Sequence, residues 1–187
     1  MIFLNKYNNS KNIRFKSFEE TLNISFKRGF KTIVETGTSR GKTKFFFITR
    51  YNWKDGMSTP MFAEYAKFVN GKLYTCDISP ENINKAKKFT KKFSAHIEFY
   101  IQDSLAFLAD FNKSIDLLYL DSLDGHDPIA ASNHQLKEAQ IAIKKLHNKS
   151  LILLDDKGSK TNLSINFFIK NDFKIIYETK NQILLSK

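Results

Sequence analysis

Short apolar segments alternate regularly with longer amphipathic segments along this chain of 187 residues. Five apolar segments stand out, each rich in β-branched and aromatic residues, at 31–36, 72–77, 96–101, 115–121 and 150–155. Runs of this length between helical patterns are typical of parallel strands that are buried on both faces. The pattern therefore predicts an α/β fold built on a mostly parallel sheet.

Three of the amphipathic segments carry helix signals. Ser58 is the expected N-cap of a helix over 58–69, and Ser79, followed by proline, is the expected N-cap of a helix over 79–93. A third helix, leading into the fifth strand, is expected over 132–146. Its apolar face is predicted to contain Leu136, Ala139, Ile143 and Leu146.

The two ends of the chain have different patterns. Segment 173–187 holds two apolar runs around "TKNQ", which predicts an antiparallel hairpin at the edge of the sheet. Segment 16–29 predicts an amphipathic helix that ends at Gly29. Because the chain contains no repeat and no linker-like tract, we expect one domain over 1–187, with a helical N-terminal part over 1–30.

Composition indicates the location and the partners of the protein more than its activity. Thirty Lys and Arg against 19 Asp and Glu give a net charge of +11, which attracts anions in general. No dense basic arm or RNP-type motif is present, so a nucleic-acid partner is not expected. The single cysteine, Cys76, lies in an apolar run and is expected to be a packed thiol. With no membrane-span or signal-peptide pattern, the predicted location is cytoplasmic, away from any membrane.

The residues that follow the first two predicted strands are suited to a nucleotide-like ligand, since ligands of open parallel sheets bind beyond the carboxyl ends of the strands. The first strand runs into "ETGTSRG", in which Gly37 and Gly41 would let the backbone approach a ligand. The second ends at Asp77, where a carboxylate can accept both hydroxyls of a ribose. A purely structural turn would also explain the glycines, and their spacing is not that of a Walker A loop.

These residues, in this order, resemble the class I S-adenosylmethionine-dependent methyltransferases from about Lys31 onward. The resemblance implies a Rossmann-like three-layer sandwich with a mostly parallel seven-stranded sheet, an antiparallel C-terminal hairpin, and S-adenosylmethionine as cofactor. An NAD-binding Rossmann domain is the alternative within the fold, but the turn lacks the first spacing of G-x-G-x-x-G. The resemblance assigns cofactor binding to Glu35, Gly37, Thr38, Ser39, Gly41, Ser58, Thr59, Asp77, Ile78, Gln102, Asp103, Ser104 and Asp121.

An inserted segment, 42–55, divides the glycine motif. In relatives the turn often runs directly into a helix that begins G-x-S-T, and Gly56 to Thr59 match that start. As a lid beside the cofactor, the insert would supply a cover of aromatic residues and cations; as an ordinary short helix, it would pack on the sheet. Both interpretations concern Phe45, Phe46, Phe47, Tyr51 and Trp53, with Lys42, Lys44 and Arg50.

Three carboxylates follow the fourth and fifth predicted strands, namely Asp121, Asp155 and Asp156. Acids this close repel one another unless a positive group lies among them, and a hard divalent cation such as Mg²⁺ would meet that need. The arrangement resembles the metal-dependent O-methyltransferases of the macrocin O-methyltransferase type, which act on sugar hydroxyls. The resemblance implies that these three residues are the metal ligands.

The resemblance implies methyl transfer to a hydroxyl, in preference to an amine, of a small molecule such as a sugar or a sugar-linked metabolite. Asp121, Asp124 and His126 are the candidates for the general base. His126 and His134 could equally be exposed or packed, and Asp124 and Asp127 could equally be turn residues.

Two other functions compete with this one. Many nucleic-acid methyltransferases that act on adenine or cytosine amines carry an Asn/Asp-Pro-Pro-aromatic or Pro-Cys element after the fourth strand, and "LDSLDGHDP" has neither. A non-catalytic cofactor-binding module would give no role to the acidic residues Asp121, Asp155 and Asp156. Because so short a chain has no obvious separate substrate domain, the insert, the N-terminal segment or a second subunit must close the site, and we expect a homodimer.

Overall fold

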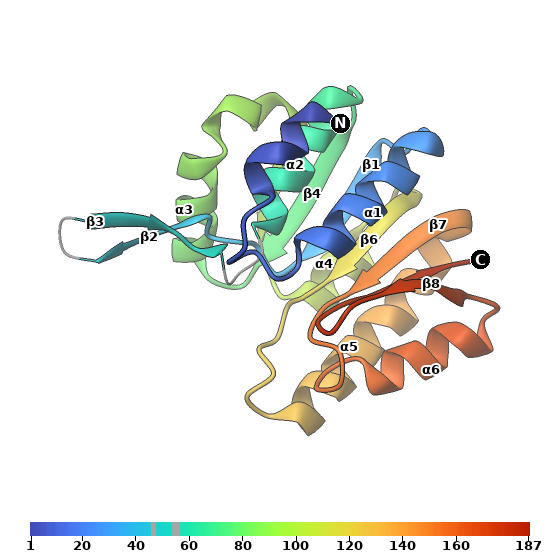
Figure 1. Ribbon diagram of the computed structural model, residues 1–187. Helices are drawn as coiled ribbons and strands as arrows, with labels where there is room; N and C mark the ends of the chain where they lie inside the picture. The colour runs from blue at the N-terminus through green and yellow to red at the C-terminus, as the bar shows by residue number, and fades with distance from the viewer. Residues whose placement is uncertain (46–47, 54–56) are drawn as a thin grey trace.

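The computed structural model, which describes residues 1–45, 48–53 and 57–187, is built around a seven-stranded sheet in the order β5-β4-β1-β6-β7-β9-β8 (Figure 1). Strands β5, β4, β1, β6 and β7 are parallel, and β9 runs antiparallel to both β7 and β8. The predicted Rossmann-like fold and its C-terminal hairpin are confirmed. The strands are β1 (Thr32–Thr36), β4 (Lys72–Asp77), β5 (Ile97–Ile101), β6 (Ile115–Leu120), β7 (Leu146–Leu154), β8 (Lys174–Glu178) and β9 (Ile183–Ser186).

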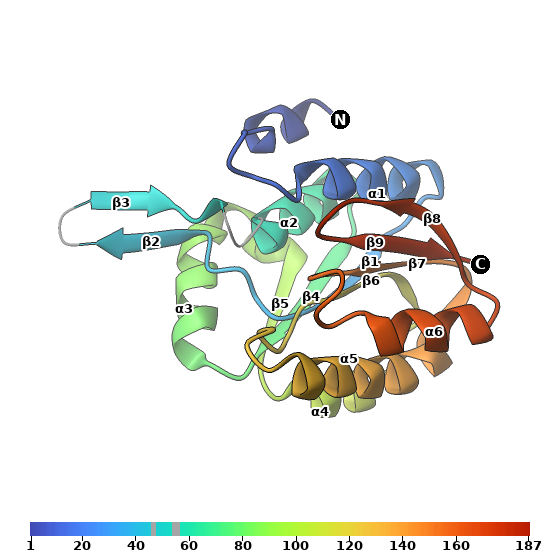
Figure 2. The same cartoon turned by 60° about the horizontal axis from the view of Figure 1, so that its bottom comes forward.

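Helices cover both faces of this sheet (Figure 2). One face carries α1 (Phe15–Lys27), α2 (Ser58–Phe68) and α3 (Pro80–Phe89), and the other carries α4 (Ser104–Asp110), α5 (Pro128–Ala142) and α6 (Asn162–Lys170). Successive strand residues point to opposite faces, so Ile33 belongs to one apolar core and Val34 to the other. No helix in the described part of the chain is long and apolar enough to cross a membrane. Cys76 is buried in the second core, as predicted.

The helix boundaries confirm some of the sequence signals and contradict others. Ser79 accepts a hydrogen bond from the backbone of Asn82 and caps α3, as predicted. Ser58 is not an N-cap: α2 begins at Ser58 itself, after Met57 in a left-handed conformation, and the Ser58 side chain is buried. The helix α1 ends as expected, with Gly29 at φ +72° one residue past its C-cap.

The helix before β7 is displaced from its predicted position. Its N-cap is Asp127, whose carboxylate accepts from the backbone of Ile129 and Ala130, so the helix starts at Pro128, four residues earlier than expected. Leu146 belongs to β7 instead of the helix. The buried face of α5 includes three polar residues, Ser132, Gln135 and Glu138, because that face lies beneath the site described below.

The predicted insert contains a two-stranded antiparallel hairpin, β2 (Lys42–Phe45) and β3 (Ile48–Tyr51), which projects from the body of the molecule (Figures 1 and 2). The alternative of a short helix packed on the sheet is therefore wrong. Residues 46–47 and 54–56 lie outside the described residues, and only the backbone of 43–45 and 48–50 is described. Most of the aromatic side chains of the insert, and the side chains of Lys44 and Arg50, lie outside the described part of the structure. The lid interpretation therefore stays a prediction.

Candidate cofactor and acceptor site

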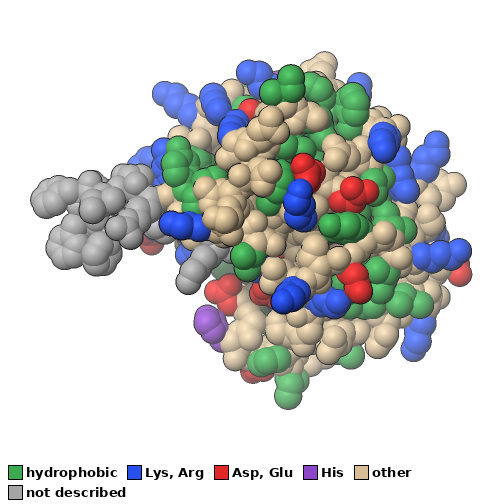
Figure 3. All heavy atoms as spheres, in the orientation of Figure 1, with side chains coloured by type: hydrophobic (Ala, Val, Ile, Leu, Met, Phe, Trp, Pro, Cys, Tyr) green, Lys and Arg blue, Asp and Glu red, His purple; other side chains and the backbone are tan. Residues whose placement is uncertain are grey.

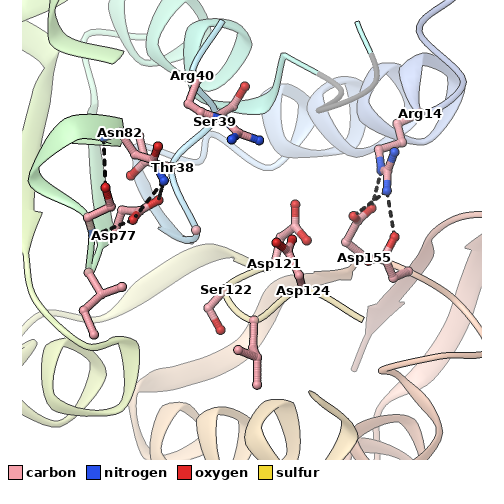
Figure 4. Close-up of a pocket in the computed structure, with 15 residues that line it drawn as sticks. Arg14, Thr38, Ser39, Arg40, Asp77, Asn82, Asp121, Ser122, Asp124 and Asp155 are labelled. Atoms are coloured by element: carbon pink, nitrogen blue, oxygen red, sulfur yellow. Dashed lines mark hydrogen bonds and ion pairs between the residues drawn. The ribbon is translucent and has the colours of Figure 1, made fainter. Parts of the chain in front are cut away.

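Two adjoining cavities open where β1, β4, β6 and β7 end (Figure 4). The larger has a volume of about 340 Å³ and the smaller about 130 Å³. This is the edge at which open parallel sheets bind their ligands. The two cavities share Gly37, Asp77, Ile78, Ser122 and Leu123.

Gly37 brings the first turn against the end of β6. A Cβ at this position would overlap the carbonyl oxygen of Asp121, and the residue has φ +83°, a conformation that only glycine adopts without strain. The Gly37 amide donates to the carbonyl of Cys76 at 3.0 Å. Gly37 therefore holds three strand ends together at the wall of both cavities.

The buried carboxylate of Glu35 organises the two halves of the divided motif. Thr75 and Thr59 donate to its Oε2 at 2.7 and 2.8 Å. The amide of Ser39 in turn donates to Thr59 Oγ1 at 2.7 Å, and Thr38 Oγ1 lies 2.8 Å from Thr75 Oγ1. The turn and the start of α2 are thus joined across the insert, as the divided-motif interpretation expects.

Glu35, Ser58 and Thr59 shape the cofactor turn from behind it. All three are buried, and none lines either cavity. Burial raises the pKa of Glu35 to about 7, although the hydroxyls of Ser58, Thr75 and Thr59 act in the opposite direction. These predicted cofactor-binding residues are placed to support Thr38 and Ser39, which do line the larger cavity.

Asp77 presents an oriented carboxylate at one side of the larger cavity (Figure 4). Its Oδ1 accepts from the amide of Ser79 at 2.8 Å, and the side-chain amide of Asn82 lies 3.1 Å from Oδ2. Carboxylate oxygens have further acceptor capacity. The residue therefore has the capacity to accept hydrogen bonds from the hydroxyl groups of a ribose, and the predicted ribose contact stays a prediction.

The smaller cavity has both polar and apolar lining residues. Gln102, Asp103 and Ser104 line it, with Ile78 and Leu123 as apolar neighbours. His134 also lines it, a residue that the sequence left between exposed and packed. Its Nε2 lies 2.8 Å from Ser104 Oγ. An adenine ring suits such surroundings.

Glu138 lies under this smaller cavity and is completely buried. Among the described residues neither of its carboxylate oxygens has a hydrogen-bond partner, and His134 Nε2 is 3.8 Å from Oε1. Burial raises its pKa, while the nearby hydroxyls of Ser104 and Ser122 lower it. Sequence reasoning missed this residue, because a glutamate in an amphipathic helix is normally assigned to the solvent face.

The three predicted metal ligands do come together. One carboxylate oxygen from each of Asp121, Asp155 and Asp156 lies within 4.8 Å of the others. The positive charge among them, however, is supplied by the protein. Arg14 bonds both oxygens of Asp155, at 2.7 and 2.8 Å, and Asp156 Oδ1 at 2.7 Å (Figure 4). Lys160, whose side chain is only 3% exposed, bonds Asp121 Oδ1 at 2.8 Å and Asp156 Oδ2 at 3.1 Å.

All six carboxylate oxygens of this acidic cluster (Asp121, Asp155 and Asp156) accept a hydrogen bond or an ion pair from a protein donor. The hydroxyl of Tyr119 donates to Asp121 Oδ2 at 3.1 Å, which completes the set. Because the Lys160 ammonium bridges Asp121 and Asp156, it holds the position between them that a cation would need. The cluster as arranged therefore does not fit a divalent cation.

Burial and charge act against each other in this cluster. Burial, together with the like charge of Asp155, raises the pKa of Asp121 well above its usual range, and Lys160 lowers it. Burial, the largest single effect, would lower the pKa of Lys160, but the carboxylates of Asp121, Asp156 and Asp155 together outweigh it and the pKa is raised. Lys160 is therefore held as an ammonium cation.

Most of the predicted site residues line one of the two cavities, but some of them line neither. Asp124 lines the larger cavity, but His126 is exposed and lines neither. Gly41 is packed against the ring of Phe89 and lines neither of these cavities. Residues that the sequence analysis did not identify as part of the site are Arg14, Arg40, Ser79, Asn82, Ser122, Leu123 and Lys160.

The fold is that of a class I methyltransferase. Residues 34–157 match the family described as "Methyltransferase domain". That match spans more than half of the chain, so the protein belongs to this family and is an S-adenosylmethionine-dependent methyltransferase. No curated protein matches the chain.

Solved structures share the fold at low sequence identity. The N-methyltransferase NodS from Bradyrhizobium japonicum WM9 is 15% identical with a TM-score of 0.60, covering 92% of this chain and 94% of its own. The SAH-bound methyltransferase PaMTH1 from Podospora anserina is 12% identical with a TM-score of 0.62, covering 91% and 77%. An rRNA methylase from Streptococcus thermophilus is 12% identical with a TM-score of 0.63, covering 96% and 98%. One of these proteins is named an N-methyltransferase and another an rRNA methylase, so the neighbours leave the acceptor of this chain open.

Proposed function

We propose that this enzyme transfers the methyl group of S-adenosylmethionine to a hydroxyl of a small molecule, a sugar or a sugar-linked metabolite. The observation that carries the proposal is the larger cavity, in which the ribose-type acid Asp77 and the acidic residues Asp121 and Asp124 face one space. Cofactor and acceptor would bind side by side there. Proximity and orientation then supply much of the rate enhancement, because the sulfonium is already reactive.

The proposed roles follow from position. Thr38, Ser39 and Asp77 would hold the ribose and the amino-acid part of the cofactor, and Gln102 to Ser104 would border its adenine. Asp121 and Asp124 line the acceptor side of the cavity and are the proposed general bases. His126 is not retained in this role, since it lies outside both linings.

The predicted Mg²⁺ is not part of the proposed reaction. A divalent cation at the acidic cluster would lower the pKa of an acceptor hydroxyl and orient it. Here Arg14 and Lys160 already offset the carboxylates, with distances of 2.7 to 3.1 Å. We therefore propose that these fixed cations take over the electrostatic task and keep the acidic residues in position.

A nucleic-acid acceptor is the second candidate, because a structure of similar fold is an rRNA methylase. Against it, Lys and Arg side chains are spread over the face seen in Figure 3 instead of forming one continuous stripe. The predicted homodimer and the cytoplasmic location stay predictions.

The test begins with calorimetric titration of S-adenosylmethionine into the purified protein. A screen of sugars and nucleotide sugars with cofactor labelled at the methyl group follows, with an RNA mixture as a second arm. We expect saturable cofactor binding and label transfer to a hydroxylated small molecule. Absence of cofactor binding would refute the proposal. Label found only in RNA would show that the acceptor is a nucleic acid and not a small molecule.

A further inference from the structure

A third cavity, the basic groove, lies next to the cofactor cavity. It has a volume of about 330 Å³ and is lined by Arg40, Lys42, Lys85, Lys88 and Phe89. Four of these five described residues are cationic and none is acidic. Arg40 also lines the larger cofactor cavity, so the two spaces meet at this side chain.

The two neighbouring cavities have opposite charge. Five aspartates line the larger cofactor cavity, and they outnumber the cations beside them, which are Arg14 and Arg40 in the lining and Lys160 behind it. A molecule that carries an anionic group and a hydroxyl is therefore oriented by the protein: repulsion keeps the anion out of the acidic cavity, and the basic groove attracts it. Arg40 stands at the boundary, where a guanidinium can bond an anion with two parallel hydrogen bonds.

Packing holds one of the groove cations in position. Lys42 Nζ lies 4.8 Å from the ring centroid of Tyr51 and 5.2 Å from that of Phe89, as in a cation–π contact with each ring. The two rings pack edge to face at 6.0 Å. Lys42 is thus oriented by the base of the hairpin and by α3, unlike a lysine that extends freely into solvent.

Gly41 allows this packing. A Cβ at Gly41 would overlap the ring of Phe89, and the residue has φ +70°, so two constraints require glycine. The carbonyl of Gly41 accepts from the amide of Asn52 at 3.0 Å, which closes the base of the hairpin. The second glycine of "ETGTSRG" therefore builds the basic groove, while the first builds the cofactor wall.

One acidic side chain stands near the groove cations. Glu81 pairs with Lys85 at 2.7 Å, one helical turn away, but its side chain is 76% exposed, and exposed pairs of this kind are worth little. This exposed pair leaves most of the charge of Lys42, Lys85 and Lys88 without an acidic partner among the described residues.

We propose that the basic groove binds the phosphate or diphosphate group of the methyl acceptor, so that the acceptor is a phosphorylated small molecule of the nucleotide-sugar kind. The inference rests on the proposed function and adds the acceptor class to it. The groove is bounded by five side chains, which suits one compact anion, whereas a nucleic-acid chain needs a basic path that follows many phosphates.

The experiment measures binding of inorganic pyrophosphate to the full chain by calorimetry at low salt. We compare the wild type with Lys42→Gln/Lys88→Gln and with the matched double variant Lys137→Gln/Lys144→Gln, which removes the same charge from a groove lined by three other lysines. We expect the first double variant to bind pyrophosphate about ten-fold or more weakly, and the control to change by less than about two-fold. Equal losses in both variants would overturn the proposal, because net charge alone would then explain the binding.

Two further arms separate the possible failures. Uridine diphosphate glucose should bind the wild type more tightly than glucose and compete with pyrophosphate; a short RNA that binds more tightly than both, and that both double variants weaken equally, would contradict a small-molecule groove. S-adenosylmethionine binding is measured on the same samples. Normal cofactor binding without pyrophosphate binding refutes the groove alone, whereas pyrophosphate binding without cofactor binding refutes the proposed function alone.

Discussion

At the scale of single residues, burial of the Glu35 carboxylate is energetically unfavourable, but this carboxylate positions the residues of the cofactor turn. Its carboxylate is completely buried, and Oε1 has no hydrogen-bond partner among the described residues. Thr59 and Thr75 nevertheless depend on its other oxygen to position Ser39 and Thr38. Burial is the main cause of its pKa of about 7.

This position predicts a stability that falls as the pH rises. The pKa of Glu35 is raised above its usual value of 4.5, so the folded protein binds the proton more tightly than the unfolded chain does. The resulting stabilisation is complete below pH 4.5 and is lost as the pH rises to about 7. Relative to Glu35→Gln, the wild type should lose about 3 kcal/mol of unfolding free energy across this window. Urea unfolding of both proteins from pH 4 to 8 measures it, and parallel curves would contradict the assignment.

Asp77 is the residue on which cofactor affinity should depend most directly. We expect Asp77→Asn to weaken S-adenosylmethionine binding by about ten-fold or more, because a charged acceptor of ribose hydroxyls is lost while the shape is kept. Asp172→Asn, an equal charge change in an exposed turn after α6, is the control. Calorimetry at one ionic strength compares them; similar affinities for the two variants would remove Asp77 from the ribose site.

At the scale of elements, the hairpin and α3 form one unit through Gly41 and Phe89. We expect Gly41→Ala to destabilise the protein by about 1–3 kcal/mol and to weaken pyrophosphate binding, since its Cβ overlaps the ring. Gly158→Ala is matched, because Gly158 also has positive φ but no described atom would lie within 4 Å of its Cβ. Equal destabilisation in urea would mean that backbone strain alone, and not the contact with Phe89, explains the effect.

The elements themselves were largely predictable. Each of the five apolar segments became a parallel strand, because an uninterrupted apolar run of this length between helices is stable only when buried on both faces. Boundaries were less predictable. Ser58 was assigned as a cap from its residue type, but α2 already includes it and its side chain is buried beside Glu35. Asp127, identified only as a possible turn residue, caps α5.

At the scale of the whole molecule, Arg14 ties the N-terminal segment to the end of β7, across 141 positions of the chain. This contact and the Lys160 bridge lead to a prediction about metal removal. Dialysis against EDTA should leave both cofactor binding and methyl transfer unchanged, because the carboxylates are already paired with cations. Methyl-transfer rates with EDTA and with added Mg²⁺ decide it; activity that is lost with EDTA and restored by Mg²⁺ would make the cluster a metal site.

Removal of one cation from the ion-pair network of Arg14, Lys160 and the acidic cluster should destabilise the folded protein. Lys160→Met leaves Asp121 and Asp156 with less compensation in a largely buried place, and we expect a loss of about 3–5 kcal/mol in unfolding free energy. Lys157→Met, which removes an exposed pair with Glu178, should change stability by less than about 1 kcal/mol. Thermal and urea unfolding measure both, and a stable Lys160→Met protein would show that the network is not needed for folding.

The sequence by itself determined the fold class and the edge of the sheet at which the chemistry lies. Parallel strands end at one edge, so Gly37, Asp77, Asp121 and Asp155 had to be neighbours once the strands were recognised. Only the tertiary structure decided what lies between them. Arg14 and Lys160 reach the acids through contacts between distant elements or from a loop, and Gly41 meets Phe89 across the hairpin base. Such contacts depend on where side chains point in space, and they leave no periodic pattern along the chain.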